Sequence, residues 1–138
     1  MTLSSDLSDL QLAITRVLWD KGEASAAEVQ VAMRRSRPLA ITTVSTLLGR
    51  LEKKGIVAHR TVGRTFVYSA RVSELDMRRK AIAGMIRNLF RGNPSEVVGQ
   101  ILSERDVGEQ DLERMRKLIQ DARVAERKKS QGRQPDGC

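Results

Sequence analysis

The spacing of apolar residues changes from a helical to a strand-like period at Gly55, and this change limits the folds available to the chain. Before Gly55, apolar residues recur every three or four positions, as on the buried face of a helix. After it, residues 56–60 and 65–69 are strand-like runs separated by residues 61–64, which is the pattern of a β-hairpin. A chain with this order places a small antiparallel sheet directly after a group of helices.

Three helices are predicted before the hairpin from their start and stop signals. Residues 8–11 and 25–28 have the spacing of capping boxes, which open helices. Residues 37–38, Arg-Pro, break the chain after the second helix, and the third is expected from about residue 42 to 54. The apolar residues expected to face inward on these helices are Leu10, Ile14, Val17, Leu18, Val29, Met33, Val44, Leu47, Leu48 and Leu51.

Three further helices are predicted after the hairpin, from about residue 73 to 90, from residue 94 onward, and from about residue 109 to 125. Three helices in about fifty residues bury too little surface to be stable alone. We therefore expect their apolar stripes to complete a core with a second copy of the chain. The residues expected at this dimer contact are Ile82, Met85, Ile86, Leu89, Val98, Ile101, Leu102, Leu112, Met115, Leu118 and Ile119.

These elements predict a mainly α fold with a small β-hairpin. Three helices followed by a hairpin is the order of a winged helix-turn-helix domain, which is expected to span residues 1–72. A three-helix dimerisation domain follows over residues 73–125. Residues 126–138 are polar and basic with Gly and Pro, so a disordered basic tail is expected there.

Positive charge is concentrated in the same part of the chain as the third helix and the hairpin. Residues 34–71 contain nine basic side chains and one acidic side chain, Glu52. Residues 73–122 contain nine of each, so the excess is local. A basic field of this kind favours binding to a polyanion, because neutralising phosphates releases condensed counterions.

Several classes of function are excluded by composition. One cysteine, Cys138, and one histidine, His59, make neither a disulfide nor a metal site, and we expect no cofactor. No catalytic set of side chains or phosphate loop is present, so the chain is not expected to be an enzyme. The four aromatic residues are too few for single-strand binding, and Trp19 and Tyr68 are expected to pack in the core. The sequence shows no membrane span or signal peptide, which predicts a cytoplasmic protein.

The residues resemble a known family. Residues 40–55, Ala-Ile-Thr-Thr-Val-Ser-Thr-Leu-Leu-Gly-Arg-Leu-Glu-Lys-Lys-Gly, resemble the third helix of the penicillinase-repressor (BlaI/MecI) family, and residues 63–68, Gly-Arg-Thr-Phe-Val-Tyr, resemble its wing. Residues 10–19 are similar to its first helix, and the similarity extends from residue 7 to about residue 122. The combination of the two motifs at this distance is more specific than either alone.

The resemblance implies a homodimeric repressor that binds a palindromic operator through its winged helix and dimerises through its last helices. It also implies release by proteolysis in the dimerisation helices, triggered by a membrane sensor protease. The best-known cleavage point of the family is an Asn-Phe pair, and the corresponding pair here is Gln100 and Ile101. The chain thus departs from the family at this pair, and the DNA-binding expectation does not depend on it.

The candidate DNA contacts lie on the third helix and the hairpin. Recognition helices present their N-terminal residues to base edges, where Thr hydroxyls form hydrogen bonds and Thr methyls pack on thymine. Arg64, at the hairpin tip beside Gly63, is expected to enter the minor groove or bind phosphate. Alternatively, Thr42 only caps the helix, and Lys53 and Lys54 only stabilise its negative end. The candidate set is Thr42, Thr43, Ser45, Thr46, Arg50, Lys53, Lys54, Arg60 and Arg64.

Two other functions remain open for a winged helix with this sequence. A ligand-sensing regulator would need a pocket with converging polar groups, and the last helices show aliphatic stripes and exposed charges instead. A protein-interaction module would bind an acidic partner surface and would leave the mobility of promoter DNA unchanged.

Overall fold

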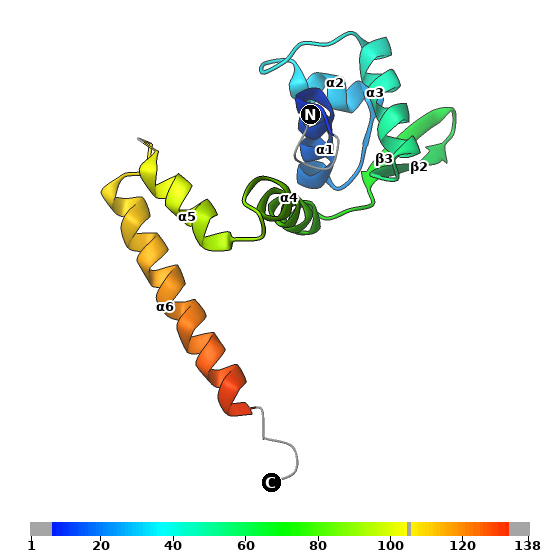
Figure 1. Cartoon of the computed structure of the whole chain (residues 1–138). Helices are drawn as coiled ribbons and strands as arrows, with labels where there is room; N and C mark the ends of the chain where they lie inside the picture. Colours follow the sequence, from blue (N-terminus) through cyan, green and yellow to red (C-terminus); the bar gives the residue numbers. More distant parts are fainter. Residues whose placement is uncertain (1–6, 105, 133–138) are drawn as a thin grey trace. The chain divides into compact units, whose positions relative to one another are not determined.

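The computed structural model describes residues 7–104 and 106–132 and divides the chain into two compact units, Met1–Gly92 and Asn93–Cys138. The sequence predicts a boundary at residue 72, one helix earlier. The helix after the hairpin goes with the first unit because Met77 is buried in its core. The elements of the first unit are α1 (Asp9–Lys21), β1 (Ala24–Ser25), α2 (Ala26–Met33), α3 (Ile41–Lys53), β2 (Val57–Val62), β3 (Thr65–Ala70) and α4 (Glu74–Leu89) (Figure 1).

Both predicted capping boxes are present. The Gln11 amide donates to Ser8 Oγ at 3.1 Å, and the Ser8 amide donates to Gln11 Oε1 at 3.1 Å. Ser25 and Glu28 make the same reciprocal pair at 3.0 and 3.2 Å, so α2 begins at the expected point. Each box satisfies backbone donors that a helix start would otherwise leave unpaired. The first turns of α1 and α2 are thereby fixed.

The sheet is antiparallel and has the order β1-β3-β2. Strands β2 and β3 form the predicted hairpin, in which His59 lies opposite Tyr68 and Val62 lies opposite Thr65. The third strand, β1, was not expected: Ala24 pairs with Tyr68. Only two residues long, β1 shows no alternation that a sequence pattern could reveal. It ties the chain before α2 to the hairpin.

The core of the first unit is mostly aliphatic and lies between the three helices and the base of the hairpin. Tyr68 is buried in this core, as expected, and the half-buried Trp19 packs against it. The Trp19 indole donates from Nε1 to the Val72 carbonyl at 2.9 Å, which fixes the chain between β3 and α4. The buried core residues are Leu7, Ile14, Leu18, Ala24, Val29, Met33, Val44, Leu47, Leu48, Leu51, Val57, Tyr68 and Met77.

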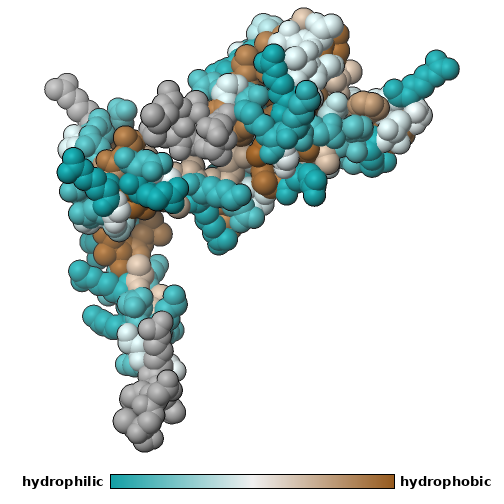
Figure 2. Space-filling view, turned by 45° about the vertical axis from the view of Figure 1, so that its right-hand side comes forward, coloured by the Kyte–Doolittle hydropathy of each residue, from teal (hydrophilic) through white to brown (hydrophobic). Residues whose placement is uncertain are grey.

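The second unit contains α5 (Pro94–Ser103) and α6 (Glu109–Gly132). Within its described residues, neither helix has a buried side chain. Figure 2 shows hydrophobic surface on this unit, and its exposed large apolar residues are Val98, Ile101, Leu102, Leu112, Leu118, Ile119 and Val124. Each of these helices has an apolar stripe. The described residues of the unit do not bury these stripes.

Helix α6 is longer than expected. Residues 126–132, which the sequence places in a disordered tail, form its last turns, and the remainder of that tail, with Cys138, lies outside the described residues. Residues 126–129, Glu-Arg-Lys-Lys, are good helix formers, and the cations near the end of the helix favour its negative pole. No helix in the described part of the chain is long and apolar enough to cross a membrane.

Candidate nucleic-acid interface

Helix α3 separates its side chains into an inward and an outward face. Val44, Leu47, Leu48 and Leu51 are buried against the first unit. The polar residues between them are exposed, as the predicted recognition face requires: Thr42, Thr43, Ser45, Thr46 and Arg50. The period of the apolar residues alone produces this separation, because residues three and four apart share one side of a helix.

The start of α3 has no side-chain cap. Its N-cap is Ala40, so the interpretation of Thr42 as a cap is wrong. The amides of a first turn carry partial positive charge and, without a cap, are available to an anion. The Thr46 hydroxyl donates to the Thr42 carbonyl at 2.8 Å, which leaves its oxygen as an acceptor and orients its methyl group. Thr42, Thr43, Thr46, Leu47 and Arg50 line one shallow surface depression on this helix.

A second depression joins α3 to the hairpin. It brings Ser45 of α3 together with Arg64 at the hairpin tip, although the two are 19 positions apart in the sequence. Ile41 and Phe66 also line it and are 40% and 47% exposed, so the surface has apolar as well as polar groups. The complete lining is Ser25, Ala26, Ala27, Ile41, Ser45, Arg64, Thr65, Phe66 and Tyr68.

Ile41 and Phe66 were missed as candidate interface residues. Alternation in residues 65–69 could have placed Phe66 on one side of the strand. It could not have shown that this side forms a depression with the start of α3, because that depends on how the helix and the hairpin pack.

The hairpin tip is built on a glycine turn. Gly63 has φ of 64°, a left-handed conformation that glycine adopts without strain, and Arg64 next to it is exposed. The turn therefore projects an arginine from the end of the two strands. This is the geometry expected for a wing.

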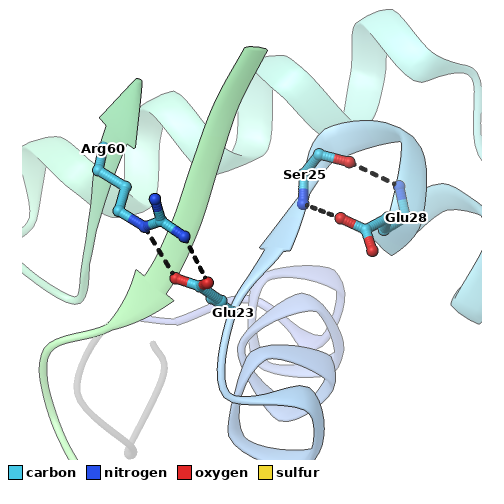
Figure 3. Close-up of polar contacts among 4 residues, drawn as sticks. All are labelled: Glu23, Ser25, Glu28 and Arg60. Atoms are coloured by element: carbon cyan, nitrogen blue, oxygen red, sulfur yellow. Dashed lines mark hydrogen bonds and ion pairs between the residues drawn. The ribbon is translucent and has the colours of Figure 1, made fainter. Parts of the chain in front are cut away.

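Arg60 is engaged within the protein. Its guanidinium binds the carboxylate of Glu23 with two hydrogen bonds, Nη2 to Oε1 at 2.6 Å and Nε to Oε2 at 3.1 Å (Figure 3). The hydrogen bond from Arg60 lowers the pKa of Glu23, and the same pair raises the pKa of Arg60. Arg60 thus ties β2 to the segment before β1, a link that spans 37 positions.

The two lysines at the end of α3 differ in their surroundings. Lys53 is exposed on the last turn of the helix. Lys54 is the C-cap residue and donates from Nζ to Gln11 Oε1 on α1 at 3.1 Å. This contact ties the end of α3 to α1, which is a structural role for Lys54 other than the expected stabilisation of the helix end. The candidate set therefore divides into residues gathered on α3 and the hairpin tip, and Arg60 and Lys54, which bind neighbouring elements.

Comparison with known proteins gives a consistent match. The family model described as "Penicillinase repressor" matches residues 7–121. The "Methicillin resistance regulatory protein MecI" of Mammaliicoccus sciuri is 24% identical over 114 residues, which is 83% of this chain and 93% of that protein.

Solved structures also match. The DNA-binding domain of the repressor BlaI is 32% identical with a TM-score of 0.48, covering 55% of this chain and 93% of that one. The crystal structure of YusO from Bacillus subtilis, 18% identical, has a TM-score of 0.53 and covers 88% of this chain and 77% of that one, which shows a shared fold.

Proposed function

The chain belongs to the penicillinase-repressor family of DNA-binding transcriptional repressors, and we propose that it acts as a homodimer on a palindromic operator. This is a family of regulators and not of enzymes. The observation that carries the proposal is the exposed Thr and Ser face of α3 beside the Arg64 tip, within a field of nine basic residues and one acid. The proposed place of action is the cytoplasm.

The proposed DNA contacts follow from this surface. Thr42, Thr43, Ser45 and Thr46 would meet base edges in the major groove, where a helix N-terminus enters. Arg50 and Lys53, further along the helix, would bind phosphates, and Arg64 would bind phosphate or the minor groove. Lys54 and Arg60 would contribute less, because Gln11 and Glu23 bind them in the free protein.

The proposed dimer rests on apolar side chains that the chain leaves exposed. Ile82 and Leu89 on α4, and the apolar stripes of α5 and α6, are exposed in a single copy. Two copies would bury these stripes against each other, with a large gain from burial of apolar surface. A two-fold dimer predicts half-sites about one helical turn, or a multiple of it, apart.

Derepression by a membrane sensor protease is a further part of the proposal. Gln100 and Ile101 lie inside α5, so a protease that binds an extended strand would require this helix to unwind locally. In a single copy the described residues of α5 have no buried side chain, so unwinding would cost little whenever the dimer opens. Cleavage there would separate α6 from the DNA-binding unit and weaken the dimer. Mass spectrometry of the protein from induced cells would detect a fragment that ends at Gln100.

The test of operator binding begins with selection of duplexes from a random library by the full-length protein. The selected duplex is then titrated in a gel-shift experiment, at low and high salt and with random competitor DNA. We expect a discrete complex with two protomers per duplex, resistance to competitor, and affinity that falls steeply with salt. No selection over random DNA would contradict an operator-binding repressor, and no binding at all would support a protein-interaction module instead.

A further inference from the structure

The only acidic residue between positions 34 and 71 binds the only histidine of the chain. Glu52 lies in the last turn of α3, and His59 lies in β2. His59 Nδ1 is 2.7 Å from Oε2 and 2.8 Å from Oε1 of Glu52. The side chains of His59 and Glu52 are 28% and 34% exposed, so their contact is partly shielded from water. A carboxylate acceptor also makes a stronger hydrogen bond than a neutral acceptor would.

The imidazole is also held by the second strand of the hairpin. It stacks on Phe66 with ring centroids 4.0 Å apart and an interplanar angle of 18°, and it lies 5.5 Å from the ring of Tyr68. The buried Tyr68 in turn belongs to the core, and the nearby charge of Glu52 adds to burial in raising its pKa. One carboxylate at the end of α3 is thus linked, through one ring, to both strands of the hairpin.

Arg60, the residue after His59, holds the opposite face of the hairpin. Successive side chains of a strand point to opposite faces, so Arg60 projects away from His59. There it binds Glu23, as Figure 3 shows. The hairpin is therefore attached to α3 on one face and to the segment before β1 on the other, five residues or fewer from its tip.

We propose that Glu52 and His59 are positioning residues for DNA binding. Their contact sets the angle between α3 and the hairpin, and so sets where Arg64 lies relative to Ser45 and the rest of the recognition face. The inference rests on the proposed function, because it assigns a role within the same DNA-binding surface. Neither residue is proposed to touch DNA.

Charge alone predicts that removal of Glu52 raises the affinity for DNA, whereas the positioning role predicts that it lowers it. A carboxylate within a basic field repels DNA phosphates, so its removal would strengthen binding if charge decided the outcome. If Glu52 positions the wing, its removal weakens binding to the selected duplex, although the protein becomes more positive. The direction of the change therefore separates the two explanations.

The experiment measures full-length variants against the duplex selected by the wild-type protein. Glu52→Ala and His59→Phe each remove the contact, and the second keeps an aromatic ring to stack on Phe66. We expect each to lose about three- to tenfold in affinity. The matched control is Asp20→Asn, which removes one negative charge from the exposed side of α1 and should leave affinity equal or slightly higher.

A second readout separates positioning from a loss of stability. Glu52→Ala is combined with Arg64→Ala, and if Glu52 acts by placing Arg64, it should have little further effect once Arg64 is absent. An equal loss in both backgrounds, with a lower unfolding temperature, would overturn the inference in favour of a structural role. Affinity that rises, or that matches the Asp20→Asn control, would overturn it in favour of charge. Failure of the wild-type protein to select any duplex would overturn the proposed function and this inference with it.

Discussion

Leu51 is one of the residues through which α3 packs into the core. It is fully buried on the inner face of α3, one position before Glu52. Leu51→Ala removes buried methyl groups and leaves a cavity, so we expect a loss of about 2–5 kcal/mol in the free energy of unfolding. Urea denaturation followed by circular dichroism measures this. Val31→Ala is the control: Val31 is 57% exposed on α2, and its change should stay within about 0.5 kcal/mol.

Two carboxylates of the first unit predict how its stability depends on pH. The Ser25 backbone and side chain, as hydrogen-bond partners, lower the pKa of Glu28, and Arg60 lowers the pKa of Glu23. A lowered folded-state pKa means stability that is present above the ordinary value of 4.5 and lost as pH falls through the lowered value. The unfolding temperature should therefore fall as the pH is lowered below about 5. The fall should be modest because both carboxylates are exposed.

The matched variant for this pH effect is Glu28→Gln. It keeps an acceptor for the Ser25 amide but does not titrate, so its unfolding temperature should fall less between neutral and acid pH than that of the wild-type protein. Parallel pH curves for the two proteins would contradict the assignment of Glu28 as a contributor.

At the scale of elements, the sequence predicts those features that short-range patterns determine. The capping boxes of α1 and α2, the inward face of α3 and the β2–β3 hairpin all depend on residues a few positions apart, and all are present. Strand β1 escaped prediction because its pairing with β3 is set by tertiary contacts. The end of α6 escaped because the expected tail contains good helix formers.

The candidate site was predictable to the same extent. Periodicity was sufficient to assign the exposed face of α3. The engagement of Arg60 by Glu23, and of Lys54 by Gln11, joins positions 37 and 43 residues apart, so no local pattern could reveal it. These contacts also explain why basic residues in one sequence window need not contribute equally to binding.

The unequal contribution of basic residues to DNA binding can be measured on the hairpin, which carries both Arg60 and Arg64. Arg64→Ala should weaken binding to the selected duplex and to random DNA alike. It should also reduce the slope of log affinity against log salt concentration by about one. This follows from an exposed guanidinium at the tip acting on phosphate. The readout is a salt titration of gel-shift affinity on both duplexes.

Arg60→Ala is the matched comparison, because Glu23 already neutralises that guanidinium in the free protein. Its effect on the salt slope should be smaller than that of Arg64→Ala. Equal slopes for the two variants would show that Glu23 releases Arg60 to DNA. A loss for Arg64→Ala that is confined to the selected duplex would instead identify it as a reader of sequence or groove shape.

At the scale of the whole molecule, the two units differ in how they meet the requirement for a core. The described residues of the first unit include thirteen buried apolar residues, whereas those of α5 and α6 include none. A helix pair of that kind gains stability from an apolar partner surface, since propensity alone stabilises isolated helices weakly. The DNA-binding unit thus has its own source of stability, while the second unit is expected to be ordered by association. On dilution, the second unit should therefore lose its ordered structure before the first unit does.

Leu118→Glu tests this dependence on a second copy. Leu118 is 67% exposed in the single chain, so a carboxylate there costs little within one protomer but would be buried unpaired in a dimer. We expect sedimentation equilibrium to show a monomer at concentrations where the wild-type protein is a dimer, and operator affinity to fall by at least tenfold. Val31→Glu is the control, an equally drastic change at an exposed apolar residue of α2, and it should leave the dimer intact. A Leu118→Glu protein that remains dimeric would place the association surface elsewhere, and its α4 residues Ile82 and Leu89 would be the next to exchange.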